Sequence, residues 1–268
     1  MKMDRLVPST MVFRTLPLKE ALKCIREAGF DSCELCSVGD WVPHYDLTDG
    51  SMEALADLIR TVAESGVRVV AMNCGFSWCD WNGVVSPDKI RQAVNALNAA
   101  SAAGAKVLTF AAGPICSDEE RPELLKIIVG LNGMMARLAA LRGIQFSIEA
   151  PHKLSISEQP YMIEQFWVAQ CKDVHITCDC AHMTYAGFDA ADIFRTYRKN
   201  AAHVHLRDAI KGNSLLDYGQ GTVDFKKYIG IFTEIDYPGY FSMEFPTDSA
   251  EEGIARLTHA KEFFGAME

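Results

Sequence analysis

Four short apolar segments of the sequence each run up to a carboxylate or a histidine and stop soon afterwards. The four side chains are Glu149, Asp179, His205 and Glu244, and the β-branched and aromatic residues before them predict buried strands. Acids that converge on one point either raise one another's pKa by repulsion or are neutralised by a divalent cation. Three carboxylates with one imidazole suit a single divalent ion, Mn²⁺, Mg²⁺, Co²⁺ or Zn²⁺. The alternative is that each acid separately caps a helix or pairs with a surface lysine.

Strand-like and helix-like segments alternate along the whole chain and would position these residues. Strands are predicted over 6–12, 30–35, 67–72, 105–111, 144–149, 174–179, 202–207 and 239–245, and helices over 16–28, 51–65, 86–103, 118–141, 158–170, 190–198, 224–235 and 250–264. Such alternation implies a parallel sheet covered by helices. Eight units in 268 residues fit a (β/α)8 TIM barrel that forms a single domain over 1–268. A doubly wound open sheet is the alternative, although the first strand–helix turn lacks G-x-G-x-x-G.

The predicted barrel would bring the four side chains together. Active sites of such barrels form at the carboxyl ends of the strands. Glu149 ends the fifth predicted strand and Asp179 the sixth, while His205 and Glu244 lie near the ends of the seventh and eighth. Side chains that point into a barrel converge toward its axis, so we expect the four to meet. His203 shares a face with His205 but lies deeper, and we interpret it as an interior histidine with satisfied hydrogen bonds.

Composition limits the class of protein and its partners. A net charge of −9 argues against a nucleic-acid surface, which needs a basic face. No apolar run approaches the roughly 18 residues that span a bilayer, and the first residues lack the apolar core of a secretory signal. Nine scattered cysteines, an odd number, suggest reduced thiols. We therefore expect a cytoplasmic protein with no nucleic-acid or membrane partner.

Several short motifs carry a family resemblance over nearly the whole chain. They lie at 29–35 (GFDSCEL), 148–152 (IEAPH), 179–182 (DCAH), 203–208 (HVHLRD), 219–225 (GQGTVDF) and 242–244 (SME). Each motif is weak alone, but their order and spacing are specific. Together they resemble the xylose isomerase-like TIM-barrel superfamily of sugar phosphate isomerases and epimerases.

The resemblance implies roles for the four converging residues. It assigns one divalent metal ion to Glu149, Asp179, His205 and Glu244, and it makes Glu149 and Glu244 the acid–base pair of an epimerase. The chemistry agrees, because a metal that holds a ketose acidifies the proton beside the carbonyl. One glutamate can remove that proton and the other can return it. The resulting enediolate would be stabilised by the metal and by Arg207.

Three further residues are predicted to contact the substrate, each with an alternative role. His182 is placed to bond a substrate oxygen, or else caps a helix or packs in a loop. Arg207 stabilises negative charge, or else pairs with Asp208 or Glu34. Trp78 belongs to a group of loop aromatics that can stack on a sugar ring, seal a lid or form a subunit contact.

Departures from the family patterns leave more than one function open. The extra histidines of the trinuclear-zinc endonucleases are missing. The loop over 152–155 lacks the added glutamate of ketose 3-epimerases. With its Pro151-His152, this loop looks more like general sugar phosphate isomerase and inosose dehydratase relatives. We expect a metal-dependent isomerase or epimerase of a small sugar or ketose. The alternatives are a lyase or dehydratase acting on a keto-inositol or 3-keto sugar, and a non-catalytic sugar-binding subunit. A small-molecule carbohydrate is the expected partner, and a homo-oligomer stays open.

Overall fold

The computed structural model describes residues 1–267 except 81, 151–154, 158, 160–163 and 165–170. The helix predicted over 158–170 therefore lies largely outside the described residues, as does the loop residue His152.

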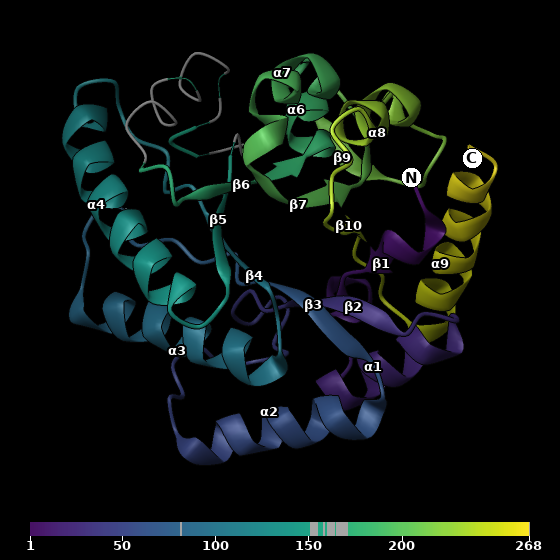
Figure 1. The fold of residues 1–268 in the computed structure, drawn as a ribbon, viewed down its shortest axis with the longest axis horizontal. Helices are drawn as coiled ribbons and strands as arrows, with labels where there is room; N and C mark the ends of the chain where they lie inside the picture. Colours follow the sequence, from purple (N-terminus) through teal and green to yellow (C-terminus); the bar gives the residue numbers. More distant parts are fainter. Residues whose placement is uncertain (81, 151–154, 158, 160–163, 165–170, 268) are drawn as a thin grey trace.

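Eight parallel strands form a nearly closed barrel (Figure 1). They are β1 (Leu6–Pro8), β2 (Ser32–Cys36), β3 (Arg68–Asn73), β4 (Val107–Ala111), β5 (Gln145–Glu149), β6 (His175–Asp179), β7 (Ala201–Leu206) and β10 (Phe241–Met243). Their order in the sheet is β1-β10-β7-β6-β5-β4-β3-β2. Beyond β1, Ser9 forms a parallel bridge with Glu34 of β2, so the two edge strands meet. The predicted (β/α)8 barrel is confirmed.

Helices surround this barrel (Figure 1). The α-helices described are α1 (Leu18–Glu27), α2 (Met52–Ser65), α3 (Pro87–Ala103), α4 (Arg121–Ala140), α6 (Cys180–Ala186), α7 (Ala190–Tyr197), α8 (Phe225–Thr233) and α9 (Ala250–Gly265). Short 3-10 helices are η1 (Met3–Arg5), η2 (Thr10–Phe13) and η3 (Arg198–Asn200).

Local sequence signals explain where several helices begin and end. The hydroxyls of Ser51, Ser86 and Ser249 accept the backbone N–H three residues later at the starts of α2, α3 and α9. Gly66 and Gly104 end α2 and α3 in the left-handed region, with φ of 65° and 84°. These caps fix the ends of the helices that hold the strands in place.

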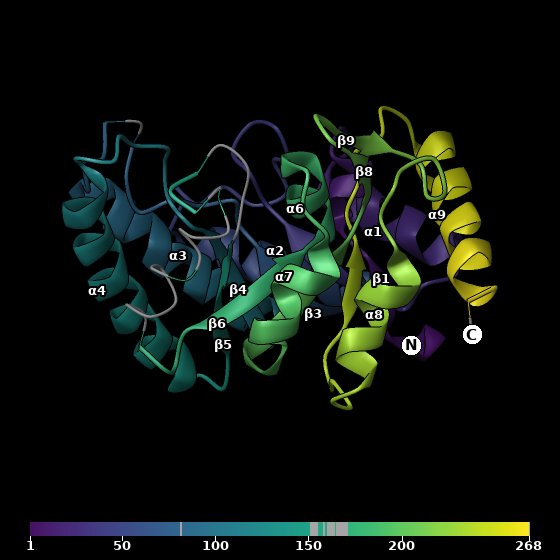
Figure 2. The same cartoon turned by 90° about the horizontal axis from the view of Figure 1, so that it is seen from above.

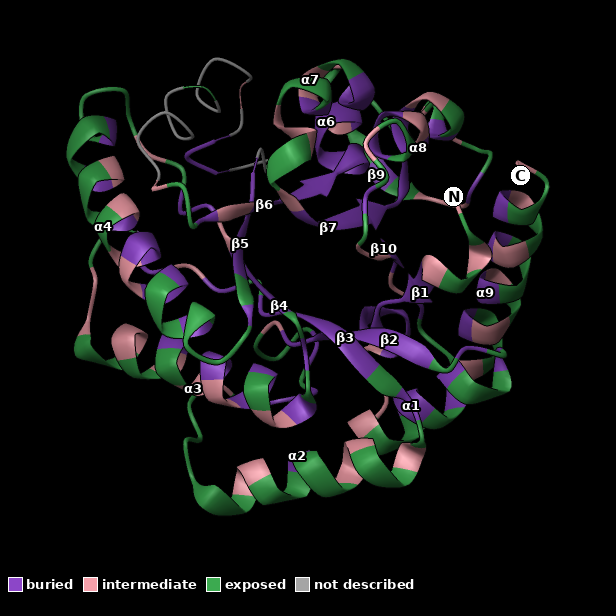
Figure 3. Cartoon of the chain, in the orientation of Figure 1, coloured by how far each residue is buried: buried purple, intermediate pink, exposed green. Residues whose placement is uncertain are grey.

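The barrel is packed on both faces of its sheet (Figure 3). On the inner face, Thr177 Oγ1 hydrogen-bonds Thr109 Oγ1 at 2.8 Å and Ser147 Oγ at 2.7 Å. On the outer face, Phe110 and Phe146 pack edge to face with ring centroids 5.1 Å apart. Hydrogen-bonded side chains therefore fill this part of the barrel interior, below the polar residues at the carboxyl ends of the strands.

Three elements differ from the sequence prediction. The first strand ends at Pro8, because Ser9 caps η2 by accepting the N–H of Met11. Helix α6 begins directly after β6 and was not predicted. The hairpin of β8 (Asp208–Ile210) and β9 (Asn213–Leu216) was also missed. Figure 2 shows α6 and this hairpin at one end of the barrel and the amino terminus at the other.

Two composition-based expectations can be compared with the structure. All nine cysteines are free thiols. Among the helices that the structure describes, none has the length and apolar character that a bilayer crossing requires.

Candidate metal centre

Four strand ends bring the predicted ligands together. Glu149 and Asp179 are the last residues of β5 and β6, His205 is the penultimate residue of β7, and Glu244 directly follows β10. One nitrogen or oxygen atom from each of these side chains lies within 4.8 Å of the others. All four side chains are buried. The sheet register explains the convergence, because Asp179 pairs with His205 and the N–H of Glu244 donates to Leu206 O at 3.1 Å.

Direct contacts tie the ligand set into one network. His205 Nδ1 lies 2.9 Å from Glu149 Oε1 and 3.5 Å from Glu244 Oε2. Arg207 Nη2 donates to Asp179 Oδ2 at 2.9 Å and to Glu244 Oε2 at 3.2 Å. The alternative pairings predicted for Arg207, with Asp208 or Glu34, are not the ones the structure has. Its charge is directed at the four-residue set.

Asp179 has two roles at once. Its Oδ1 caps α6 by accepting the N–H groups of Ala181 and His182 at 2.6 and 3.4 Å. Its Oδ2 faces the interior, where His182 Nε2 lies 3.4 Å away and also 3.6 Å from Glu149 Oε1. The structure therefore adds His182 to the cluster, and the helix-cap alternative for Asp179 is true of one oxygen only.

Burial gives the carboxyl groups different proton affinities. It raises the pKa of Glu244 to about 8, and repulsion by Glu149 and Glu34 adds to this effect against the attraction of His205 and Arg207. Asp179 is equally buried, yet His182 and Arg207 hold its pKa well below the usual range. Burial lowers the pKa of His205, but Glu244 and Glu34 raise it by more, so it lies well above the usual value.

The donor set fits a divalent cation. Three carboxylates and an imidazole converge, and Arg207 supplies one fixed positive charge against them. Negative charge therefore exceeds positive charge in this cluster, and the raised pKa of Glu244 reflects that excess. A bound cation would neutralise the charge in place of a proton on Glu244. Oxygen-rich sets with one imidazole suit Mg²⁺, Mn²⁺, Co²⁺ or Zn²⁺. The cluster could therefore hold one metal ion.

A cleft of about 790 Å³ is lined by residues at and beyond the carboxyl ends of β2, β3 and β4. Cys74, which follows β3, and Ala111, which ends β4 next to Glu149 in the register, belong to its wall. Trp78 does not line it. That indole is 1% exposed and donates Nε1–H to Asn132 Oδ1 at 2.7 Å, so the structure places it in the core, and Phe76 lines the cleft instead.

Two residues at the site were not predicted to act there. Asn73, the last residue of β3, donates Nδ2–H to Glu244 Oε1 at 3.2 Å. Glu34 of β2 is fully buried and its Oε2 lies 2.9 Å from His205 Nε2. The available signal was a charged or amide residue at the end of an otherwise apolar strand. His203 is an interior histidine, as expected, and its Nε2 lies 2.7 Å from Ser242 Oγ.

The chain belongs to the xylose isomerase-like TIM barrel family, whose model matches residues 22–263. Among curated proteins it is similar to the inosose dehydratase of Glaesserella parasuis serovar 5 (strain SH0165). The two are 26% identical over 169 residues, which cover 55% of this chain and 55% of that protein. The match spans about half the length of such relatives.

Solved structures share the whole fold. A D-tagatose 3-epimerase-like protein superposes with a TM-score of 0.76 over 98% of each chain, at 17% identity. The IolI protein with a bound zinc atom gives a TM-score of 0.73 over 96% of each chain, at 18% identity. Likeness at these identities establishes the barrel architecture.

Proposed function

We propose that the protein is a divalent-metal-dependent isomerase or epimerase of a small sugar or ketose, with Glu149 and Glu244 as its acid–base pair. The observation that carries the proposal is the convergence of Glu149, Asp179, His205 and Glu244 within 4.8 Å at the carboxyl ends of four strands. Family membership supports it, as does the fold shared with a D-tagatose 3-epimerase-like protein.

The four converging residues would hold the ion. When bound, it would polarise the carbonyl of a ketose and acidify the proton on the adjacent carbon. The zinc of the IolI structure supports a metal on this scaffold.

Glu149 and Glu244 are arranged for a two-base reaction. Glu149 ends β5 and Glu244 directly follows β10, and β6 and β7 lie between these two strands in the sheet, so the two carboxyl groups reach the centre from different directions. Glu244 could deliver a proton to the substrate from its side of the centre. Glu149 can take the proton from the opposite side of the substrate. Removal of the carbon-bound proton by one glutamate, followed by delivery of a proton from the other to the opposite face of the same carbon, inverts that centre. Delivery to the former carbonyl carbon, with transfer of the neighbouring hydroxyl proton to the former carbonyl oxygen, moves the carbonyl.

Arg207 and His182 would bind the oxygens of the substrate. The Arg207 guanidinium already lies within 3.2 Å of two ligand carboxylates, so its positive charge is fixed where an enediolate oxygen would develop. His182 Nε2 lies between Asp179 and Glu149 on the first turn of α6. Neither side chain needs a large movement to reach a ligand in the centre.

The charges of the cleft favour a substrate without a phosphate group. Its described wall carries three carboxylates, Asp40, Asp46 and Asp80, against one cation, Lys89. A phosphate dianion beside these carboxylates would be repelled. Hydroxyl groups of a neutral sugar can instead donate hydrogen bonds to them. The cleft volume of about 790 Å³ is ample for a monosaccharide-sized ligand.

A dehydratase is the second candidate, favoured by the 26% identity to an inosose dehydratase over 169 residues. Proton removal beside a carbonyl begins both reactions. In the dehydratase the carbanion equivalent expels a β-hydroxyl as water instead of regaining a proton. Protonation of that leaving oxygen would also fall to a carboxyl group such as Glu244.

The test is turnover in deuterated water. Wild-type protein loaded with Mn²⁺, Co²⁺ or Zn²⁺ is incubated with unphosphorylated ketoses and a keto-inositol, followed by NMR and mass spectrometry. Deuterium incorporation with retained composition indicates an isomerase or epimerase, whereas loss of water indicates the dehydratase. Glu149→Gln and Glu244→Gln should each abolish turnover, and Thr109→Val, an interior hydroxyl away from the ligands, should retain it. Metal-loaded wild type that catalyses neither process on any member of the panel contradicts the proposal.

A further inference from the structure

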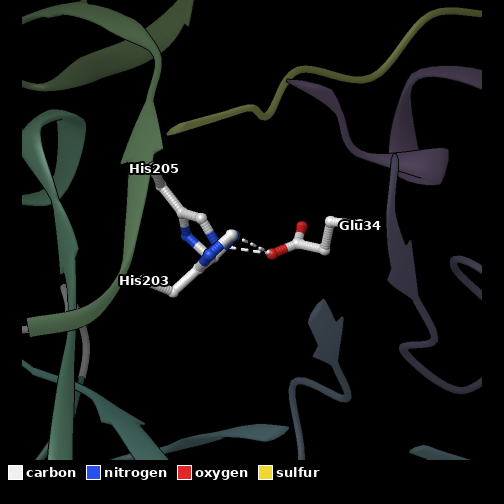
Figure 4. Close-up of side chains that lie close together, drawn as sticks. All are labelled: Glu34, His203 and His205. Atoms are coloured by element: carbon white, nitrogen blue, oxygen red, sulfur yellow. Dashed lines mark hydrogen bonds and ion pairs between the residues drawn. The ribbon is translucent and has the colours of Figure 1, made fainter. Parts of the chain in front are cut away.

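A second buried cluster lies directly behind the candidate ligands. Glu34 reaches from β2 toward His203 and His205 of β7 (Figure 4). Its Oε2 lies 3.0 Å from His203 Nε2 and 2.9 Å from His205 Nε2. None of the three side chains is more than 1% exposed. No partner is needed from outside the barrel, because all three residues belong to its inner face.

His205 is thus held from both sides. Nε2 faces Glu34, and Nδ1 faces Glu149 and Glu244 at 2.9 and 3.5 Å. A carboxylate only accepts hydrogen bonds, so without metal both ring nitrogens of His205 donate, Nε2 to Glu34 and Nδ1 to Glu149. A cation would replace the hydrogen on Nδ1, because that nitrogen faces the other ligand atoms, while Nε2 would keep its hydrogen bond to Glu34. A metal-binding histidine is commonly oriented through its second nitrogen in this way.

His203 keeps the Glu34 carboxylate in place. Its Nε2 lies within hydrogen-bond distance of both Glu34 Oε2 and Ser242 Oγ, and its ring stands at 85° to that of His205. The other oxygen of Glu34, Oε1, is buried and has no hydrogen-bond partner among the described residues. The carboxylate is therefore held through Oε2 alone, and both imidazoles contact that one oxygen.

We propose that Glu34 is a positioning residue that fixes the tautomer and orientation of His205, with His203 and Ser242 as its support, so that Nδ1 is the metal-binding nitrogen. The inference rests on the proposed metal centre. The same three side chains have the donor types of a metal site, but His205 is shared with the four-residue set, and Nε2 is the nitrogen that faces Glu34. One ion per chain follows from this assignment.

Nitrogen NMR of the zinc-loaded protein tests the tautomer directly. With ¹⁵N-labelled histidine, long-range correlation spectra distinguish a protonated nitrogen from a metal-bound one. His205 should show a protonated Nε2 and a zinc-bound Nδ1. Zinc on Nε2 of His205, or two zinc ions per chain by metal analysis, would overturn the proposal.

Metal affinity of variants tests the role of Glu34. Competition with a chelator should show affinity about ten- to a hundredfold weaker for Glu34→Ala. Glu34→Gln keeps an oxygen acceptor of the same length and should recover part of the loss. Thr109→Val is the control, because it removes a buried hydroxyl of the barrel interior that does not touch a ligand, and it should bind like wild type.

The outcomes separate this inference from the proposed function. Wild type that binds no divalent ion overturns the metal centre, and the role of Glu34 with it. Wild type that binds the ion while Glu34→Ala binds it equally well overturns the role of Glu34 alone. Wild type that binds the metal but turns over no sugar contradicts the proposed reaction. In that case the metal affinities of wild type and Glu34→Ala still decide the role of Glu34. If Glu34→Ala does not fold, the spectra of wild type and the affinity of Glu34→Gln decide.

Discussion

Asn73 fixes one oxygen of Glu244: its side-chain Nδ2 donates to Glu244 Oε1 at 3.2 Å, while Arg207 and His205 face Oε2. The two oxygens of the candidate acid–base residue are thus assigned to different neighbours. Asn73 Oδ1 meanwhile accepts the N–H of Gly75 and holds the turn after β3.

The first prediction concerns this hydrogen bond. Asn73→Asp retains an acceptor for Gly75 but replaces the donor to Glu244 with a carboxylate. We expect metal affinity and turnover to fall about ten- to a hundredfold, as for other partners of metal ligands. Asn73→Ser, which keeps a hydroxyl donor, should lose less. Chelator competition and steady-state kinetics measure both, and an Asn73→Asp variant that matches wild type would contradict the role.

The second prediction concerns Arg207, whose guanidinium is buried between Asp179 and Glu244. Arg207→Met should destabilise the metal-free protein by about 3–5 kcal/mol, because it leaves buried carboxylates uncompensated. Saturating Mn²⁺ should restore more stability to this variant than to wild type. Urea unfolding with chelator and with metal measures the difference.

A matched control for Arg207 is the exposed pair of Arg195 with Glu234, 2.7 Å apart and more than 40% exposed on both sides. Arg195→Met should change the free energy of unfolding by less than about 1 kcal/mol. Equal effects of the two variants would show that the central guanidinium does not compensate buried charge.

The third prediction is a pH dependence of stability without metal. The pKa of Glu244 is raised from 4.5 to about 8 by burial, so the folded state holds a proton that the unfolded state releases. Stability from this group is complete below pH 4.5 and is lost as pH rises to about 8. His205, whose pKa is also raised, acts in the same direction above its ordinary 6.5.

Comparison with Glu244→Gln isolates the carboxyl group. The free energy of unfolding of wild type, measured in chelator across pH 5 to 8, should fall relative to that of the variant. The lowered pKa values of Asp179 and Glu34 act at more acidic pH and do not enter this window. Parallel curves for the two proteins would refute a protonated Glu244.

The fourth prediction concerns packing of the last helix on the first loop. A Cβ added at Gly253 of α9 would collide with Cε1 of Phe13, a buried ring of η2. Gly253→Ala should therefore cost about 1–3 kcal/mol of stability by overpacking. A Cβ added at Gly230 of α8 would meet nothing within 4 Å among the described residues, and Gly230→Ala should be neutral or stabilise by up to about 1 kcal/mol. Thermal unfolding compares the pair.

Periodicity predicted the barrel well because each strand and helix has strong local signals. Ser86 with Pro87 marks the start of α3, and Gly104 marks its end, so the sequence specified this element almost to the residue. Helix α6 was missed because it is seven residues long and begins directly after its N-cap, Asp179, which is also the last residue of β6. The β8–β9 hairpin was missed because its strands are only three and four residues long, too short to show a periodic pattern.

The ligand candidates could be named from sequence because they end apolar strands, but their neighbours could not. Asn73 and Glu34 act across the barrel, on strands far from Glu244 and His205 in the chain. Their partners depend on register and on closure of the sheet, which local patterns do not encode. Trp78 is the opposite case, because its place in the loop after a strand end did not decide whether the ring would line the cleft or pack in the core.

The pairing of β1 with β10 has a consequence for folding. Leu6 pairs with Phe241, so the barrel strands that come first and last in the sequence must pair although almost the entire chain separates them. Contacts of such sequence separation form slowly and late. Glu244 follows β10 and is the last of the four candidate ligands in the sequence, so a chain without β10 lacks both a strand of the barrel and one of the candidate ligands. A chain still in synthesis, with β10 not yet made, has an open sheet edge and three of the four donors, and metal affinity should therefore report completion of the fold.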